Sequence, residues 1–154
     1  MRVLIAAFGN ELRGDDGFGI AVLRQLESRP PHDDGADVRL LEVCTGGIRL
    51  AQELLSPCDR LIIIDAVSKG SAPGTVHVMK VEAVPDAREV DLHLAVPSKA
   101  LGVAKALGAL PAETFLVGCE PAGVDELTME LSDAVRAAVP IAARHVQALV
   151  EGRG

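Results

Sequence analysis

The sequence predicts a three-layer α/β fold, in which a mainly parallel twisted sheet carries helices on both faces. Apolar runs of strand length alternate with segments of helical periodicity along most of the chain. Residues 61–64 are apolar at every position, which is typical of a central strand that is buried on both faces. Connections in such folds are right-handed and place the carboxyl ends of parallel strands at one edge, where sites form.

The first half of the chain predicts two strands and two helices. Residues 3–7 form a short apolar strand, and a glycine-rich turn leads from it into a helix that begins near residue 17. The apolar face of this helix ends near residue 28, where a loop rich in proline, aspartate and glycine follows. Alternation then predicts a strand at residues 37–43, and a turn at Gly46 and Gly47 leads to a short helix at residues 48–55.

The second half predicts three strands and two helices. Residues 60–66 contain the continuous apolar run, and residues 75–81 alternate as a further strand. Pro97 suits the first position of a helix that extends to residue 107. A strand at residues 114–119 precedes a helix at 132–150, which we expect to be kinked or restarted at Pro140.

Composition and charge limit the class of protein. The chain has 154 residues, 49% hydrophobic and 24% charged, which suits one domain over residues 1–154. A formal net charge of −7 argues against nucleic acid or an anionic membrane surface as the main partner. The chain has no apolar run near the roughly 18 residues of a membrane span, and no signal-peptide layout. We expect a cytoplasmic protein without a membrane or nucleic-acid partner.

The turn at residues 8–19 contains two adjacent carboxylates, Asp15 and Asp16. Its glycine spacing matches neither the dinucleotide-binding motif nor the P-loop, and the two aspartates would repel a phosphate. Carboxylates at this position suit a cation. Alternatively they cap the following helix, because an aspartate there accepts hydrogen bonds from free N–H groups. Both hypotheses hold together if one carboxylate caps and its neighbour faces the cleft.

A third carboxylate, Asp65, ends the strongest predicted strand and lies at the same edge of the sheet. Burying it there is costly unless it is paired, capping or bound to a metal, so we expect a functional role. His93 alone would be an ordinary loop histidine. If it joins Asp16 and Asp65, the set suits a divalent transition metal such as nickel, zinc, iron or manganese.

The remaining histidines and cysteines suggest structural roles. His77 lies within an alternating strand and is predicted to be structural. The three cysteines are too few and too scattered for a disulfide framework or a zinc knuckle. Cys119, at the end of a strand, is predicted to be a small buried hydrophobe and not a nucleophile.

These pieces, in order, resemble the hydrogenase maturation endopeptidases from residue 1 to about residue 139. The resemblance is carried by the following motifs: Gly9-Asn10-x-Leu12-x-x-Asp15-Asp16-Gly17-x-Gly19, Thr45-Gly46-Gly47, the strand that ends in Asp65-Ala66, His93, and Leu116-Val117-Gly118 with Pro121. The first motif, in order with Asp65 and His93, is the most specific part.

The resemblance implies a cytoplasmic endopeptidase that removes a C-terminal extension from the large-subunit precursor of a nickel–iron hydrogenase. In that family, cleavage follows nickel insertion, and the nickel carried by the precursor is what the protease recognises. The resemblance implies that the metal contacts are Asp16, Asp65 and His93, with Asp16 and Asp65 as the catalytic residues. Nickel then arrives with the substrate and need not be bound to the resting enzyme.

Two other functions stay open at this point. The chain could be a metal-sensing chaperone that binds the precursor without cleaving it. It could also be a nucleotide-dependent α/β enzyme, which the acidic glycine-rich turn disfavours.

Overall fold

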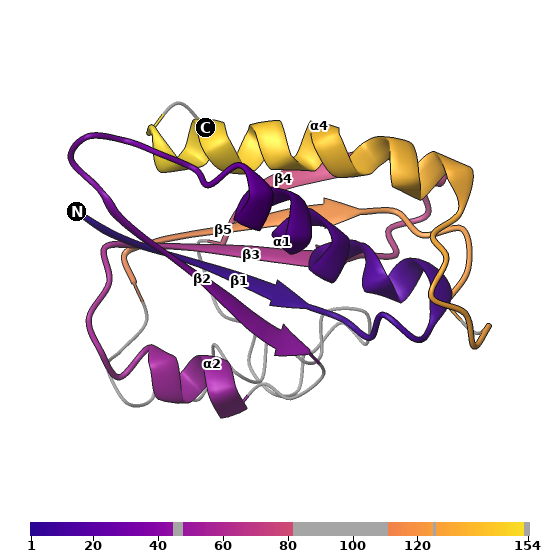
Figure 1. Ribbon diagram of the computed structural model, residues 1–154, viewed down its shortest axis with the longest axis horizontal. Coiled ribbons are helices and arrows are strands. Elements are labelled where there is room, and N and C mark those ends of the chain that lie inside the picture. Colours follow the sequence, from indigo (N-terminus) through magenta and orange to yellow (C-terminus); the bar gives the residue numbers. More distant parts are fainter. Residues whose placement is uncertain (45–47, 82–110, 125, 153–154) are drawn as a thin grey trace.

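The computed structural model describes residues 1–44, 48–81, 111–124 and 126–152, and its sheet confirms the predicted α/β class (Figure 1). Within these residues the sheet has five strands in the order β2-β1-β3-β5-β4. Four of them are parallel, and β4 pairs with β5 in the antiparallel direction at the edge. The strands are β1 (Arg2–Phe8), β2 (Asp37–Cys44), β3 (Arg60–Ala66), β4 (Val76–Lys80) and β5 (Glu113–Cys119).

Helices cover both faces of this sheet, as the sequence predicts. On one face lie α1 (Phe18–Ser28) and α4 (Asp133–Val150), while α2 (Ile48–Glu53) lies on the other (Figure 1). The side chains of Ile5, Ile62 and Val117 point into the core beneath α1 and α4. Those of Leu4 and Ile63 belong to a second core, which contains residues of α2. The alternation of side chains along each strand divides the apolar residues between these two cores.

The central position of β3 explains its continuous apolar sequence. It lies between β1 and β5, and Leu61 to Ile64 are all almost completely buried. Strand alternation places Asp65 on the same face as Leu61 and Ile63, which is the face that carries α2. The last residue pairs of β3 and β5 are Asp65 with Gly118 and Ala66 with Cys119. Asp65 therefore lies at the carboxyl edge of the sheet.

The start of α1 lies directly against this edge. A Cβ atom at Gly19 would come within 2.3 Å of the carbonyl oxygen of Phe8 and 2.8 Å of that of Ile64. Only glycine allows the helix to approach the ends of β1 and β3 so closely. The short 3₁₀ helix η1 (Gly14–Gly17), which contains Asp15 and Asp16, is thereby placed above the ends of the two central strands.

The last helix lies where the sequence predicts it, but of the two predicted effects of Pro140, a kink or a restart, the restart does not occur. Helix α4 continues through Pro140 and does not restart there. Pro140 is exposed, so the hydrogen bond that its missing N–H would make is lost on the side that faces solvent. The helix expected at residues 97–107 lies outside the described residues. Among those that are described, no helix combines the length and apolar character needed to cross a membrane.

Candidate active site

Two carboxylates, Asp16 and Asp65, meet above the ends of β1 and β3. Asp16 lies in η1, where its Oδ2 accepts a hydrogen bond of 3.0 Å from the backbone N–H of Asn10. Asp65 follows Ile64 in β3, and its Oδ1 accepts a bond of 2.8 Å from the N–H of Ala66. The structure thus confirms the prediction that the opening turn and the end of the strongest strand share one edge.

Gly9 packs against the backbone of Asp16 and lies near the carboxylate of Asp65. Its φ of +129° is a backbone conformation that residues with side chains rarely adopt. A Cβ atom there would lie 2.1 Å from the backbone oxygen of Asp16 and 3.9 Å from Oδ1 of Asp65. The turn therefore requires glycine at this position, both for its backbone angle and for the space that the two aspartates occupy.

The environment of Asp65 strongly disfavours its charged form. Burial and, to a smaller extent, the neighbouring negative charge of Asp16 raise the pKa of Asp65, while the hydrogen bond from Ala66 lowers it. The resulting pKa is about 8. Its side chain is almost completely buried. A cation between the two carboxylates would remove this electrostatic cost, so the donor set fits a divalent metal or a shared proton. A buried carboxylate with a raised pKa beside a second carboxylate is typical of a functional site.

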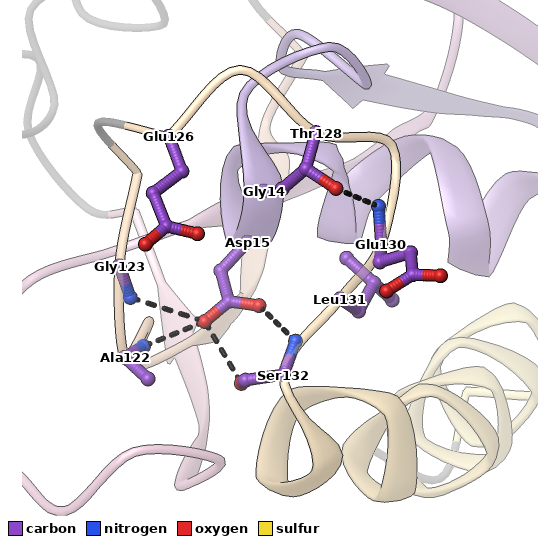
Figure 2. Close-up of a pocket in the computed structure, with 9 residues that line it drawn as sticks. All are labelled: Gly14, Asp15, Ala122, Gly123, Glu126, Thr128, Glu130, Leu131 and Ser132. Atoms are coloured by element: carbon purple, nitrogen blue, oxygen red, sulfur yellow. Dashed lines mark hydrogen bonds between the residues drawn. The ribbon is translucent and has the colours of Figure 1, made fainter.

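Asp15 has a different role from that of its neighbour Asp16. Its carboxylate is 2% exposed and accepts bonds from the N–H groups of Ala122 (2.8 Å), Gly123 (3.2 Å) and Ser132 (2.7 Å), and from the Ser132 hydroxyl (2.9 Å) (Figure 2). Burial raises the pKa of Asp15, but these hydrogen bonds outweigh burial and hold the pKa below its ordinary value. Asp15 therefore ties the opening turn to the segment before α4.

The capping hypothesis for these aspartates is wrong. Neither η1 nor α1 has a hydrogen bond from a side chain at its N-terminal cap, and Gly17 precedes α1. The two aspartates nevertheless differ, since Asp15 makes structural contacts and Asp16 lies near Asp65, and the functional role of Asp16 stays a prediction. The structural one binds a distant loop and not the adjacent helix.

His93, the third predicted metal ligand, and residues 45–47, the second glycine turn, lie outside the described residues. Among the residues that the structure does describe, no group of three or more histidine, cysteine, aspartate or glutamate side chains could hold a metal ion. Asp16 and Asp65 are thus two members of the predicted set, and the position of the third stays a prediction.

A second acidic group, Glu120, lies just beyond β5. Its carboxylate accepts bonds from the N–H groups of Lys69 (2.8 Å) and Gly70 (3.0 Å), and the Nε2 atom of His77 lies 3.7 Å from it. Glu120 holds the turn after β3, and His77 packs beside it, as its predicted structural role requires. Sequence reasoning did not identify Glu120, because a lone glutamate after a strand carries no distinguishing pattern.

Cys119 lies in the same region but does not provide a reactive thiol. It is buried, and burial together with the negative charges of Asp15 and Glu120 raises its pKa to about 11. A thiol with such a pKa stays protonated at neutral pH and is a poor nucleophile. This agrees with its prediction as a small buried hydrophobe.

Comparisons with known proteins identify the family. Residues 20–149 match the HycI family, described as hydrogenase maturation protease. The hydrogenase expression/formation protein HupM of Azotobacter chroococcum is 37% identical over 99% of this chain and 73% of its own. The hydrogenase 2 maturation protease of Escherichia coli is 31% identical over 100% of this chain and 93% of its own.

Solved structures give the same result. The hydrogenase maturating endopeptidase HybD from Escherichia coli superposes with a TM-score of 0.86 at 31% identity, over 100% of this chain and 94% of that chain. The nickel–iron hydrogenase maturation protease HybD from Thermococcus kodakarensis has a TM-score of 0.78 at 35% identity, over 97% and 99% of the two chains. This chain is therefore a peptidase that belongs to the hydrogenase maturation protease family and has a role in hydrogenase maturation.

Proposed function

We propose that this chain removes the C-terminal extension from the large-subunit precursor of a nickel–iron hydrogenase after nickel has been inserted. The observation that carries the proposal is the pair of carboxylates at the edge of the sheet, where Asp16 raises the pKa of the buried Asp65. The family membership supports a peptide as the substrate. The acidic pair supports a substrate that brings a cation with it.

In this proposal the nickel is part of the substrate. The precursor holds the metal, and Asp16 and Asp65 offer carboxylate oxygens to it, with His93 as the expected imidazole ligand. Before the precursor binds, Asp65 mostly holds a proton at neutral pH, because its pKa is about 8. The positive charge of the metal stabilises the ionised form of Asp65, so binding depends on a loaded precursor.

The same pair of carboxylates suits a role in peptide hydrolysis. A metal held beside the peptide can polarise its carbonyl, and a carboxylate can orient the attacking water and accept its proton. The pKa of about 8 belongs to Asp65 in the free enzyme; once a cation is bound beside it, its ionised carboxylate lies at the edge where the chain would be cut and can orient and deprotonate the attacking water. Burial is the main cause of that raised pKa, and the charge of Asp16 adds to it.

The decisive experiment is a cleavage assay that uses the cognate large-subunit precursor with and without nickel. We expect the mass of the nickel-loaded precursor to fall by the mass of a C-terminal peptide, and the nickel-free form to stay intact. Asp65→Ala and Asp16→Ala should each lower kcat/KM by about 100-fold or more, the scale of a lost acid–base group. Asp34→Ala is the matched control, because this aspartate is fully exposed in the loop after α1.

Two results would contradict the proposal. Cleavage by Asp16→Ala and Asp65→Ala at the rate of the unmodified enzyme would exclude the pair from the chemistry. Binding of the loaded precursor without any cleavage would favour the metal-sensing chaperone instead.

A further inference from the structure

A hollow of about 560 Å³ lies between the opening turn and the segment before α4 (Figure 2). Glu126 and Glu130 lie on either side of it in this view, and Asp15 lies between them with its carboxylate turned toward Ser132. The candidate active site does not include this hollow, since neither Asp16 nor Asp65 lines it. It is therefore a separate feature of the surface.

The walls of the hollow are fixed by backbone hydrogen bonds. The N–H of Gly14 donates to the carbonyl of Thr128 (2.8 Å), and the N–H of Asp15 donates to that of Gly123 (3.0 Å). Arg13 and Thr128 also form an isolated parallel β-bridge. Together with the carboxylate of Asp15, these contacts join two parts of the chain that lie more than 100 residues apart. The hollow thus exists before any partner binds.

Three exposed apolar residues belong to the segments that form this acidic hollow, although their side chains do not line it. Leu12, Leu127 and Met129 are 54%, 83% and 66% exposed, although single apolar residues on a surface need no explanation. Here all three lie on the two segments that the bridge between Arg13 and Thr128 joins. We call the five residues Leu12, Glu126, Leu127, Met129 and Glu130 the docking patch. Exposed apolar side chains that gather beside a hollow are typical of an interaction site.

We propose that the docking patch binds a segment of the hydrogenase precursor that presents a lysine or arginine between apolar side chains. This inference rests on the proposed function. Charge complementarity favours a basic residue, because Arg13 is the single basic residue in 10–17 and 120–132, whereas acidic residues recur in both. The apolar members suit the flanking side chains.

Continuity with the acidic pair favours the precursor as the occupant. Leu12 belongs to the same turn as Asp16, and the side chain of Asn10 accepts a bond of 3.0 Å from the N–H of Leu12. The N–H of Asn10 in turn holds the carboxylate of Asp16. A precursor whose cleaved peptide bond lies at Asp16 and Asp65 therefore has the docking patch beside it. The patch contributes binding energy and takes no part in the chemistry.

The test compares variants of the docking patch in the cleavage assay on nickel-loaded precursor. Leu127→Ser combined with Met129→Ser should raise KM about tenfold, equivalent to about 1.4 kcal/mol, and leave kcat unchanged. Both side chains are exposed, so the melting temperature should not change. Leu55→Ser is the matched control, because Leu55 is 58% exposed after α2, and it should keep the KM of the unmodified enzyme. An unchanged KM in the double variant would overturn the proposal.

A second pair of variants tests the charge. Glu126→Gln combined with Glu130→Gln should raise KM and make it less dependent on added NaCl, because salt screens charges on exposed surfaces. Asp33→Asn combined with Asp34→Asn removes the same charge from the loop after α1 and should leave the salt dependence as it was. Equal salt dependence in the two double variants would contradict a basic segment in the precursor.

The outcomes also separate this proposal from the proposed function. If the unmodified chain binds the precursor without cleaving it, the proposed function fails, and Kd measured by calorimetry replaces KM in the same comparison. If sedimentation shows a dimer that Leu127→Ser with Met129→Ser dissociates, the patch binds a second copy of this chain and the proposal is wrong.

Discussion

Asp15 and Asp65 are both buried aspartates, yet their surroundings act on them in opposite directions. Asp15 accepts four hydrogen bonds from the segment before α4, and its pKa is lowered. Asp65 accepts one bond from Ala66 and lies near the like charge of Asp16, and its pKa rises to about 8. Both side chains are shielded from solvent, but Asp65 lies deeper among protein atoms, so burial and then the charge of Asp16 dominate its pKa, whereas hydrogen bonds outweigh burial at Asp15.

This contrast distinguishes a structural carboxylate from the one that we propose to be functional. The fold provides Asp15 with donors, and its ionised form stabilises the native state. The fold provides Asp65 with a repelling neighbour, which leaves its charge to be compensated by a proton or by a cation from outside. Local destabilisation of this kind is expected where a protein binds a ligand that neutralises it. Substitutions at these positions should therefore have opposite effects on stability and activity.

The largest expected effect on stability is that of Asp15→Ala. This substitution leaves three backbone N–H groups and one hydroxyl without their acceptor, which costs about 3–5 kcal/mol. In thermal unfolding, the midpoint should fall by about 10 °C. Asp16→Ala is the matched control, because the Asp16 carboxylate accepts a hydrogen bond from the N–H of Asn10 and lies near the like charge of Asp65, so its midpoint should fall much less.

The loss of stability in Asp15→Ala should depend on pH in a definite direction. Because the pKa of Asp15 is lowered on folding, its stabilisation is present above the unfolded pKa and is lost as the pH falls through the folded pKa. The difference between the unmodified chain and Asp15→Ala should therefore shrink at low pH. An equal difference at pH 7 and pH 3 would mean that the ionised carboxylate is not the stabilising form.

Asp65→Asn should show the opposite dependence on pH. The pKa of Asp65 rises from 3.8 to about 8 on folding, so its favourable contribution is complete below the unfolded pKa and is lost as the pH rises toward 8. Asparagine does not titrate. Relative to the unmodified chain, Asp65→Asn should thus gain stability between pH 5 and pH 8, by several degrees in midpoint and in the absence of metal.

Asp16→Asn sharpens this test, because it removes the like charge and leaves Asp65 in place. It should reduce the slope of stability against pH without abolishing it, since burial is the larger cause of the raised pKa. Parallel pH curves for the unmodified chain and Asp65→Asn would contradict a raised pKa for Asp65. Chelator should be present throughout, so that adventitious metal does not hide the effect.

The sequence predicted the position of Asp65 at the edge of the sheet but not the contacts of Asp15, and the reason is the distance to their partners. Asp65 ends a continuous apolar run, so its position at the edge of the sheet follows from a pattern within its own strand. The donors to Asp15 lie 107 to 117 residues further along the chain. They belong to an irregular segment without periodicity, so the pairing depends on tertiary structure and leaves no local pattern.

The positions of the strands were predicted more completely than the direction of β4 or the course of the last helix. Alternation indicated a strand at residues 75–81, but it does not show that β4 joins β5 in the antiparallel direction at the edge. Pro140 indicated a kink or a restart in the final helix, and α4 continues through it without a restart. Propensity is a local preference, and here the packing of α4 against the sheet outweighs it.

The smallest expected effect on stability comes from removing one of the four hydrogen bonds that Asp15 accepts. Ser132→Ala removes the 2.9 Å bond from the hydroxyl and keeps the 2.7 Å bond from the N–H, so it should cost about 1 kcal/mol, or about 2–4 °C in midpoint. Ser132 precedes α4, but its side chain makes no capping bond to that helix, so the loss belongs to Asp15. Ser132→Thr keeps a hydroxyl and should retain most of the stability. Combining Ser132→Ala with Asp15→Ala should cost less than the sum of the two, because both remove the same bond, and full additivity would show that the hydroxyl acts elsewhere.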